Sequence, residues 1–218
     1  MNSLYWTAVA VTSVATAVLL VAEHRESPTL KWIAKPIASL GFIAAALAVG
    51  ATGHLYGQIV LAGLCLSMLG DVLLIPSSTG GAFLGGVGAF LLAHVAYAVA
   101  FLVAGVDWRF VAGGAVAFFA FGFFFGRWIV PQAPPRLRLP VVAYILVICS
   151  MASLAVGVYG HFGGGWLVPA AATCFVVSDI SVAMDRFAGA SFIHRAWGLP
   201  LYFGAQLLFA ATCVGGGA

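Results

Sequence analysis

The stretch CLSMLGDVLLIP, Cys65–Pro76, places Asp71 inside an apolar run with no other charged residue nearby. A second stretch, ATCFVVSDISVAMDRF at residues 172–187, repeats the pattern with Asp179. Runs of this kind are typical of helices that cross a membrane. A charged side chain near the middle of such a helix costs about 2.5–3.5 kcal/mol on insertion scales. Two carboxylates kept at that cost predict a functional site.

The composition supports the membrane interpretation. The chain has 218 residues, of which 63% are hydrophobic and 7% charged, and its mean hydropathy is +1.12. Soluble domains carry about 25% charged residues, so the sequence excludes a water-soluble globule. The apolar runs reach the roughly 20 residues that one helical span needs. They do not alternate every second residue as the strands of a membrane barrel do.

We therefore predict an all-α polytopic membrane protein, with one eight-helix membrane domain over residues 1–218. The first run has no Lys or Arg before it, which argues against a cleavable signal peptide and favours a retained helix. The predicted spans are Leu4–Ala22, Trp32–Gly50, Leu55–Ile75, Ala82–Ala104, Phe110–Val130, Leu139–Tyr159, Trp166–Met184 and Ala196–Val214.

Basic residues predict the orientation. The even-numbered loops between these spans hold only Arg109, whereas the odd-numbered loops and their flanks hold the other eight Lys and Arg residues. By the positive-inside rule the odd loops face the cytoplasm and both termini lie outside, as in a bacterial inner-membrane protein. Asp71 and Asp179 then lie at one depth, about 6–9 Å inside the cytoplasmic boundary. The eight are Arg25, Lys31, Lys35, Arg127, Arg136, Arg138, Arg186 and Arg195.

A weak internal repeat relates the two aspartates. Asp71 precedes His94 by 23 residues, and Asp179 precedes Tyr202 by 23. The spacing predicts two four-helix halves in parallel orientation, related by an axis along the membrane normal.

Other polar residues are candidates to support the aspartates. Ser67 lies one turn before Asp71 and could bond to it. Lys35, just before Pro36, is a candidate phosphate contact or a boundary anchor. A purely structural interpretation also stands, in which Asp71 simply pairs with Lys35.

Two further polar stripes lie on otherwise apolar spans. His94 and Tyr97 are three residues apart, and Tyr202 and Gln206 four, so each pair faces one side of its helix. We predict that both carboxylates face one cavity, within about 12 Å of each other, with these four side chains on its wall. A lone histidine in an apolar helix can also be a packing residue.

The sequence predicts no metal and no organic cofactor. The four cysteines lie in apolar runs without CxxC spacing, which favours small packing residues. The GFFFG segment, Gly122–Gly126, is typical of helix packing. Asp185 adjoins Arg186 at a predicted helix end and can reach the interface. No nucleic-acid partner is predicted, and nothing in the sequence bears on homo-oligomers.

Several motifs together resemble the YhhN-like membrane family of lysoplasmalogenases. They are GLCLSMLGDVLLI, FLGGVGAFLLAHVAYAVAF, VSDISVAMDRF and LYFGAQLL, in this order, and the resemblance extends from Lys35 to the C-terminus. It implies an eight-helix hydrolase that cleaves the vinyl ether of lysoplasmalogens, a lysophospholipid substrate, into a fatty aldehyde and a glycerophospho-ethanolamine or -choline. By motif match Asp71 and Asp179 are the implied catalytic residues, and Ser178 belongs to the third motif, VSDISVAMDRF.

The chemistry fits the residues. Vinyl-ether hydrolysis protonates the β-carbon, and water then attacks the oxocarbenium ion. This calls for a general acid and a carboxylate that stabilises positive charge or activates water. Lys35 or Arg195 could meet the phosphate, while His94 and Tyr97 could bond the water or ether oxygen. The sequence does not distinguish which aspartate is the acid.

Two other classes are compatible with intramembrane aspartates. One is a proton-coupled transporter or lipid-binding protein, which would consume no vinyl ether in detergent. The other is an intramembrane aspartyl protease, whose YD, GxGD and PAL motifs are missing: Met68 stands two residues before Gly70, and Ser178 precedes Asp179.

Overall fold

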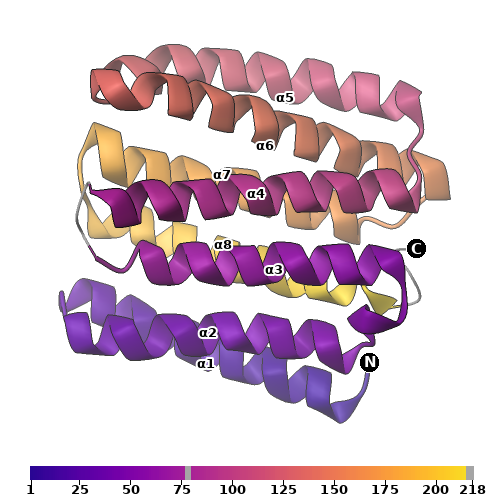
Figure 1. The fold of residues 1–218 in the computed structure, drawn as a ribbon, viewed down its shortest axis with the longest axis horizontal. Coiled ribbons are helices and arrows are strands. Elements are labelled where there is room, and N and C mark those ends of the chain that lie inside the picture. Colours follow the sequence, from indigo (N-terminus) through magenta and orange to yellow (C-terminus); the bar gives the residue numbers. More distant parts are fainter. Residues whose placement is uncertain (77–79, 215–218) are drawn as a thin grey trace.

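The computed structural model describes residues 1–76 and 80–214, and within these ranges the chain forms eight long α-helices arranged as a bundle (Figure 1). Short 3₁₀ turns, η1 (Ala51–Gly53) and η2 (Val130–Gln132), and a π-helical turn, η3 (Met184–Ala188), interrupt the connections. The eight predicted helices are thus confirmed, with ends shifted by a few residues. They are α1 (Ser3–His24), α2 (Pro28–Ala48), α3 (Leu55–Leu73), α4 (Gly81–Ala104), α5 (Trp108–Ile129), α6 (Pro135–Phe162), α7 (Leu167–Ala183) and α8 (Phe192–Ala211).

Local sequence signals set the helix ends. Asn2, Asp107 and Ser191 each accept a bond from a backbone N–H of the following first turn, which caps α1, α5 and α8. Proline stands in the first turn of α2 and α6, where its missing N–H costs nothing. Gly163 ends α6 in the left-handed conformation, at φ 65°.

The helices pair along the chain and then across it. α1 packs on α2, α3 on α4, α5 on α6 and α7 on α8. Between the two halves of the chain, α4 packs on α6 and α8 packs on α2. These reciprocal contacts are what a two-fold relation between two four-helix halves would produce.

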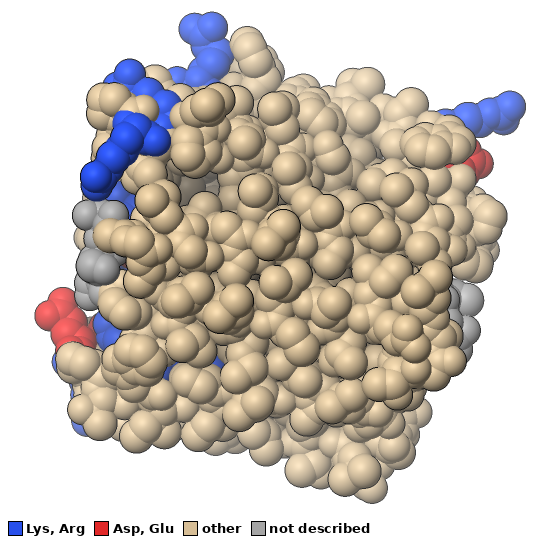
Figure 2. Space-filling view, in the orientation of Figure 1, with Lys and Arg blue, Asp and Glu red and all other residues tan. Residues whose placement is uncertain are grey.

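The surface is that of a membrane protein. Helices α1 to α7, the last with its η3 extension, are each long and apolar enough to span a membrane. α8 is more polar, and it runs through the bundle in contact with α1, α2, α3 and α7. Large apolar side chains such as Val116 and Phe124 of α5 are about 70% exposed or more. On the face shown in Figure 2 the charged side chains gather at the ends of the bundle and leave an apolar band between them.

Basic residues concentrate at one end of the bundle. Helices α2, α4, α6 and α8 begin there, and all Lys and Arg except Arg109 lie at or near it (Figures 1 and 2). Arg109 lies at the start of α5, at the opposite end, where α1 begins and α8 ends. We call these the basic end and the terminal end.

Candidate functional site

A cavity of about 350 Å³ opens toward the basic end and contains both aspartates on its wall. Asp71 reaches it from α3 and Asp179 from α7. Their side chains are nearly closed off from solvent, at 2% and 17% exposure. Both helices run toward the basic end, so each aspartate lies one to two turns from the cavity mouth.

Asp71 is surrounded by donors. The ammonium of Lys35 on α2 lies 3.3 Å from its Oδ1. The hydroxyls of Ser39 on α2 and Tyr202 on α8 both donate to its Oδ2, at 2.7 Å. One cation and two hydroxyl donors match the acceptors of an ionised carboxylate. Donors from two neighbouring helices, α2 and α8, therefore hold the carboxyl of Asp71, an arrangement that suits its ionised form.

Asp179 has a different environment. The hydroxyl of Tyr144 on α6 donates to its Oδ2 at 2.8 Å. The Nε2 atom of His94 on α4 lies 3.5 Å from the same oxygen, and His94 is fully buried. His94 Nδ1 lies 2.6 Å from the carbonyl of Phe90, which can only accept, so Nδ1 carries the hydrogen.

This tautomer has a consequence for Asp179. Neutral His94 then presents the Nε2 lone pair toward the carboxyl of Asp179, and two facing lone pairs repel in a buried site. A proton between the two groups removes the repulsion. His94 and Asp179 are thus placed so that one proton could lie between them at the cavity wall. We call them the His94–Asp179 pair.

The cavity has an apolar part and a charged mouth. Its apolar part lies between α5, α6 and α7, with Gly122 and Phe125 on one side and Val176 and Ile180 on the other. Charged side chains from α1, α2, η3 and α8 line the mouth. They are Glu23, Lys31, Asp185, Arg186 and Arg195.

Several predicted site residues lie on the cavity wall. Lys35, Ser178, Arg195 and Tyr202 line it together with the two aspartates. The Ser178 hydroxyl donates to the carbonyl of Phe175 within its own helix. Lys35 does pair with Asp71, as the structural interpretation holds, and the pair faces the cavity.

Other predicted wall residues lie behind the cavity instead. His94 reaches it only through Asp179. The hydroxyl of Tyr97 donates to Oε1 of Gln206 at 2.8 Å, and both residues are fully buried. The expectation that these three side chains line the wall is wrong, because none of them borders the cavity; the rings of His94 and Tyr97 pack against Phe175 instead.

The expected bond between Ser67 and Asp71 is also wrong. The Ser67 hydroxyl lies 3.5 Å from that of Tyr97, and Ser39 donates to Asp71 in its place. Ser39, Tyr144 and Glu23 are site residues that sequence reasoning missed. A phenol in the middle of an apolar span was a usable signal for Tyr144, of the same kind that singled out His94.

The fold and site together define a polytopic α-helical membrane protein with two carboxyl groups in a cavity near its basic end. The family model described as the YhhN family matches residues 30–213, and the chain belongs to this family. It is 27% identical over 166 residues to lysoplasmalogenase TMEM86A from Bos taurus. That match covers 71% of this chain and 65% of the relative's length. No solved structure matches the chain.

Proposed function

We propose that this protein is a lysoplasmalogenase: it hydrolyses the vinyl ether of a 1-alkenyl lysophospholipid to a fatty aldehyde and a glycerophosphodiester. The main observation behind this proposal is that the carboxyl groups of Asp71 and Asp179 line one cavity but have different neighbours. Membership of the YhhN family and the name of the Bos taurus relative support the same activity.

The surroundings of the carboxyls suggest their roles. The His94–Asp179 pair is placed to hold a proton at the cavity wall, so we assign Asp179 as the general acid. Asp71 lies next to Lys35 and two hydroxyl donors, which suit its ionised form, so we assign it to stabilise positive charge and to accept a proton from water.

The reaction then balances in three steps. Asp179 gives its proton to the β-carbon of the vinyl ether, and the double-bond electrons form the new C–H bond, which leaves an oxocarbenium ion beside the Asp71 carboxylate. Water adds to the α-carbon and loses a proton to Asp71. The hemiacetal collapses to aldehyde and alcohol as its hydroxyl proton passes to the ether oxygen, and the proton on Asp71 returns to Asp179 through solvent, which restores both carboxyl groups. Water is the only co-reactant consumed.

The shape of the cavity suits such a substrate. A single hydrocarbon chain can occupy the apolar part between α5, α6 and α7, while the head group stays at the charged mouth. The vinyl ether, at the head of the chain, then lies between the two aspartates.

The test is aldehyde release from a 1-alkenyl-2-hydroxy-glycerophosphoethanolamine by the purified protein in detergent. We expect Asp71→Asn and Asp179→Asn each to lower kcat by at least about 10²–10⁴, the usual contribution of acid–base groups. Asp107→Asn is the matched control, because Asp107 caps α5 at the terminal end and Asn caps equally well.

Three results would contradict the proposal. Full activity in either variant would remove that aspartate from the mechanism. Binding of the lipid without turnover by the wild-type protein would favour a lipid-binding protein or transporter. Cleavage of a helical peptide instead of the lipid would favour a protease.

A further inference from the structure

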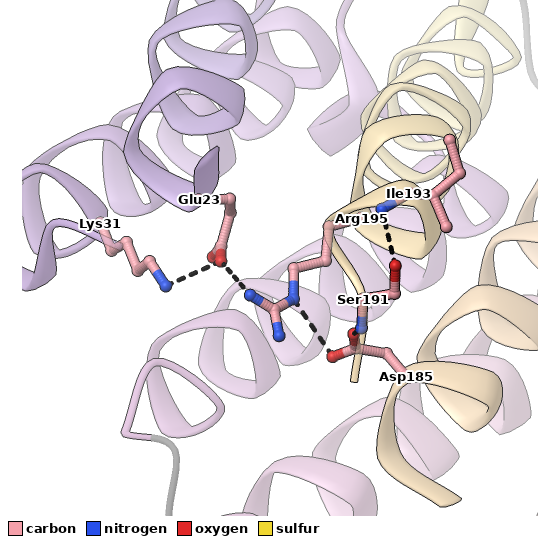
Figure 3. Close-up of polar contacts among 6 residues, drawn as sticks. All are labelled: Glu23, Lys31, Asp185, Ser191, Ile193 and Arg195. Carbon is pink, nitrogen blue, oxygen red and sulfur yellow. Dashed lines mark hydrogen bonds and ion pairs between the residues drawn. The ribbon is translucent and has the colours of Figure 1, made fainter. Parts of the chain in front are cut away.

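The mouth of the cavity holds an ordered chain of ion pairs (Figure 3). Glu23 Oε2 lies 2.7 Å from Lys31 Nζ and 3.1 Å from Arg195 Nη1. The Nε atom of Arg195 continues the chain to Asp185 Oδ2 at 3.2 Å. Asp185 Oδ1 in turn accepts the backbone N–H of Ser191. Four charged side chains from four different elements are therefore connected in one row, and all four line the cavity.

Stability does not account for this cluster. The side chains of Glu23, Lys31, Asp185 and Arg195 are 16–29% exposed. Ion pairs that remain in contact with water contribute only about 0–1 kcal/mol each. A ligand-binding role accounts better for charges placed on a cavity wall.

The ion pairs leave unused hydrogen-bonding groups on both the basic and the acidic side chains. Arg195 has five N–H donors and Lys31 three, and the bonds among the described residues use two and one of them. Both contacts to Glu23 reach Oε2, so Oε1 keeps its lone pairs for a further donor. The mouth thus offers donors for a phosphate beside an acceptor for an ammonium.

The depth of the cluster fits a lysophospholipid. Lys31 precedes Lys35 by one turn on α2, about 6 Å along the axis, and Lys35 contacts Asp71. The charged mouth therefore lies about one turn outside the carboxyls, comparable to the glycerol unit that separates a vinyl ether from the phosphate.

We propose that Glu23 of α1 selects substrates whose phosphate bears an amine: Arg195 and Lys31 bind the phosphate, and Glu23 binds the ammonium. This assignment rests on the proposed function and names the head-group class that the site prefers. Glu23 precedes residues 30–213, so the match to the family model does not include it.

The experiment compares two substrates in wild-type and Glu23→Gln protein. One is 1-alkenyl-glycerophosphoethanolamine, and the other is 1-alkenyl-glycerophosphate, which lacks the amine. The ratio to follow is kcat/KM for the ethanolamine lipid divided by kcat/KM for the amine-free lipid. We expect this ratio to fall about tenfold in the variant, as loss of one charge-assisted hydrogen bond predicts. The amine-free lipid should be hydrolysed at least as well, because Glu23→Gln frees Arg195 and Lys31 from their shared anion.

Two further variants separate selectivity from damage. Glu26→Gln removes a carboxylate that does not line the cavity and should leave the ratio unchanged. Glu23→Asp keeps the charge and should restore part of the preference. Equal effects of Glu23→Gln on both substrates would overturn the proposal.

A binding measurement distinguishes this failure from failure of the proposed function. The saturated 1-alkyl analogues of both lipids cannot be hydrolysed by this route, and their Kd values report head-group recognition alone. Absence of hydrolysis in the wild type would overturn the lysoplasmalogenase proposal. A preference for the amine-bearing analogue that Glu23→Gln does not reduce would overturn the role of Glu23.

Discussion

Asp71 and Asp179 are the same residue type at a similar depth, yet their neighbours give them different chemistry. A lysine and two hydroxyls donate to Asp71, whereas Asp179 accepts from one tyrosine hydroxyl and faces a buried histidine at 3.5 Å. The partners cross between the halves of the chain: His94 of α4 serves Asp179 of α7, and Tyr202 of α8 serves Asp71 of α3. The equal 23-residue spacing thus reflects an exchange of partners.

The role of His94 as a positioning residue can be tested directly. His94→Gln removes the group that can share the proton of Asp179, and we expect kcat to fall about tenfold to a hundredfold with little change in KM. This is less than the 10²–10⁴ that a general acid itself contributes. The measurement is aldehyde release at saturating and limiting substrate.

Tyr97→Phe is the contrasting variant for that prediction. It leaves Oε1 of the buried Gln206 without its donor, which costs about 1–3 kcal/mol of stability. Because Tyr97 does not line the cavity, kcat should stay near the wild-type value. A similar loss of kcat in both variants would mean that His94 acts only through packing.

Residue-scale partners were only partly predictable from the sequence. The aspartates, Lys35 and Tyr202 stand out because polar groups are costly in apolar spans. Ser39 does not stand out, since a serine in a membrane helix commonly bonds its own preceding turn, and the Ser39 hydroxyl also lies 3.0 Å from the carbonyl oxygen of Lys35. Which of two hydroxyls meets Asp71 depends on helix rotation, and this the sequence does not determine.

At the scale of elements, hydropathy was enough to find the helices but not their irregular ends. The π-helical turn Met184–Ala188 follows α7 where Asp185 turns toward Arg195 and the N–H of Ser191. Such a turn depends on partners from α8 and the preceding loop, so periodicity along α7 alone cannot reveal it.

The close crossing of α7 and α8 positions Tyr202. A Cβ built on Gly198 would lie 2.6 Å from the Cβ of Ser181 and would also collide with its hydroxyl. We expect Gly198→Ala to lower stability by about 1–3 kcal/mol through overpacking. It should also lower activity, because Tyr202, one turn further on, would move away from Asp71. Thermal unfolding in detergent and aldehyde release measure the two effects.

Two variants control for the helix itself. Gly204→Ala on α8 meets open space and should leave both stability and activity near wild type or slightly raise stability. Adding Ser181→Gly to Gly198→Ala removes the colliding Cβ and should restore activity. If the double variant stays inactive, the crossing does not position Tyr202.

At the scale of the whole molecule, the two four-helix halves pack in a similar but not identical way. α8 packs on α1 as well as on α2, whereas α5 packs mainly against α6. The side of the bundle near α5 therefore keeps the apolar part of the cavity, lined by Phe121, Gly122 and Phe125. The sequence indicated two similar halves, but the difference between them depends on long-range packing.

The separation of charge along the bundle predicts how the protein lies in its membrane. Eight of the nine Lys and Arg residues belong to the basic end, and the cavity opens toward the same end. The positive-inside rule then places the basic end in the cytoplasm and both termini outside. Substrate would enter from the cytoplasmic leaflet, with its head group at the mouth.

Two fusions test this orientation. A fluorescent reporter that matures only in the cytoplasm should be dark when fused after Ala218, and bright when fused to a chain truncated after Gln132, at the basic end that follows α5. A phosphatase that is active only outside the cytoplasm should give the opposite pattern at the two positions. The physical reason is that translocating segments rich in Lys and Arg is unfavourable. Arg127 beside the fusion point, and Arg25, Lys31 and Lys35 between α1 and the first turns of α2, all remain in the truncated chain and keep this end inside. Bright fluorescence after Ala218 together with phosphatase activity after Gln132 would mean that the protein has the opposite orientation, with the cavity mouth at the outer leaflet.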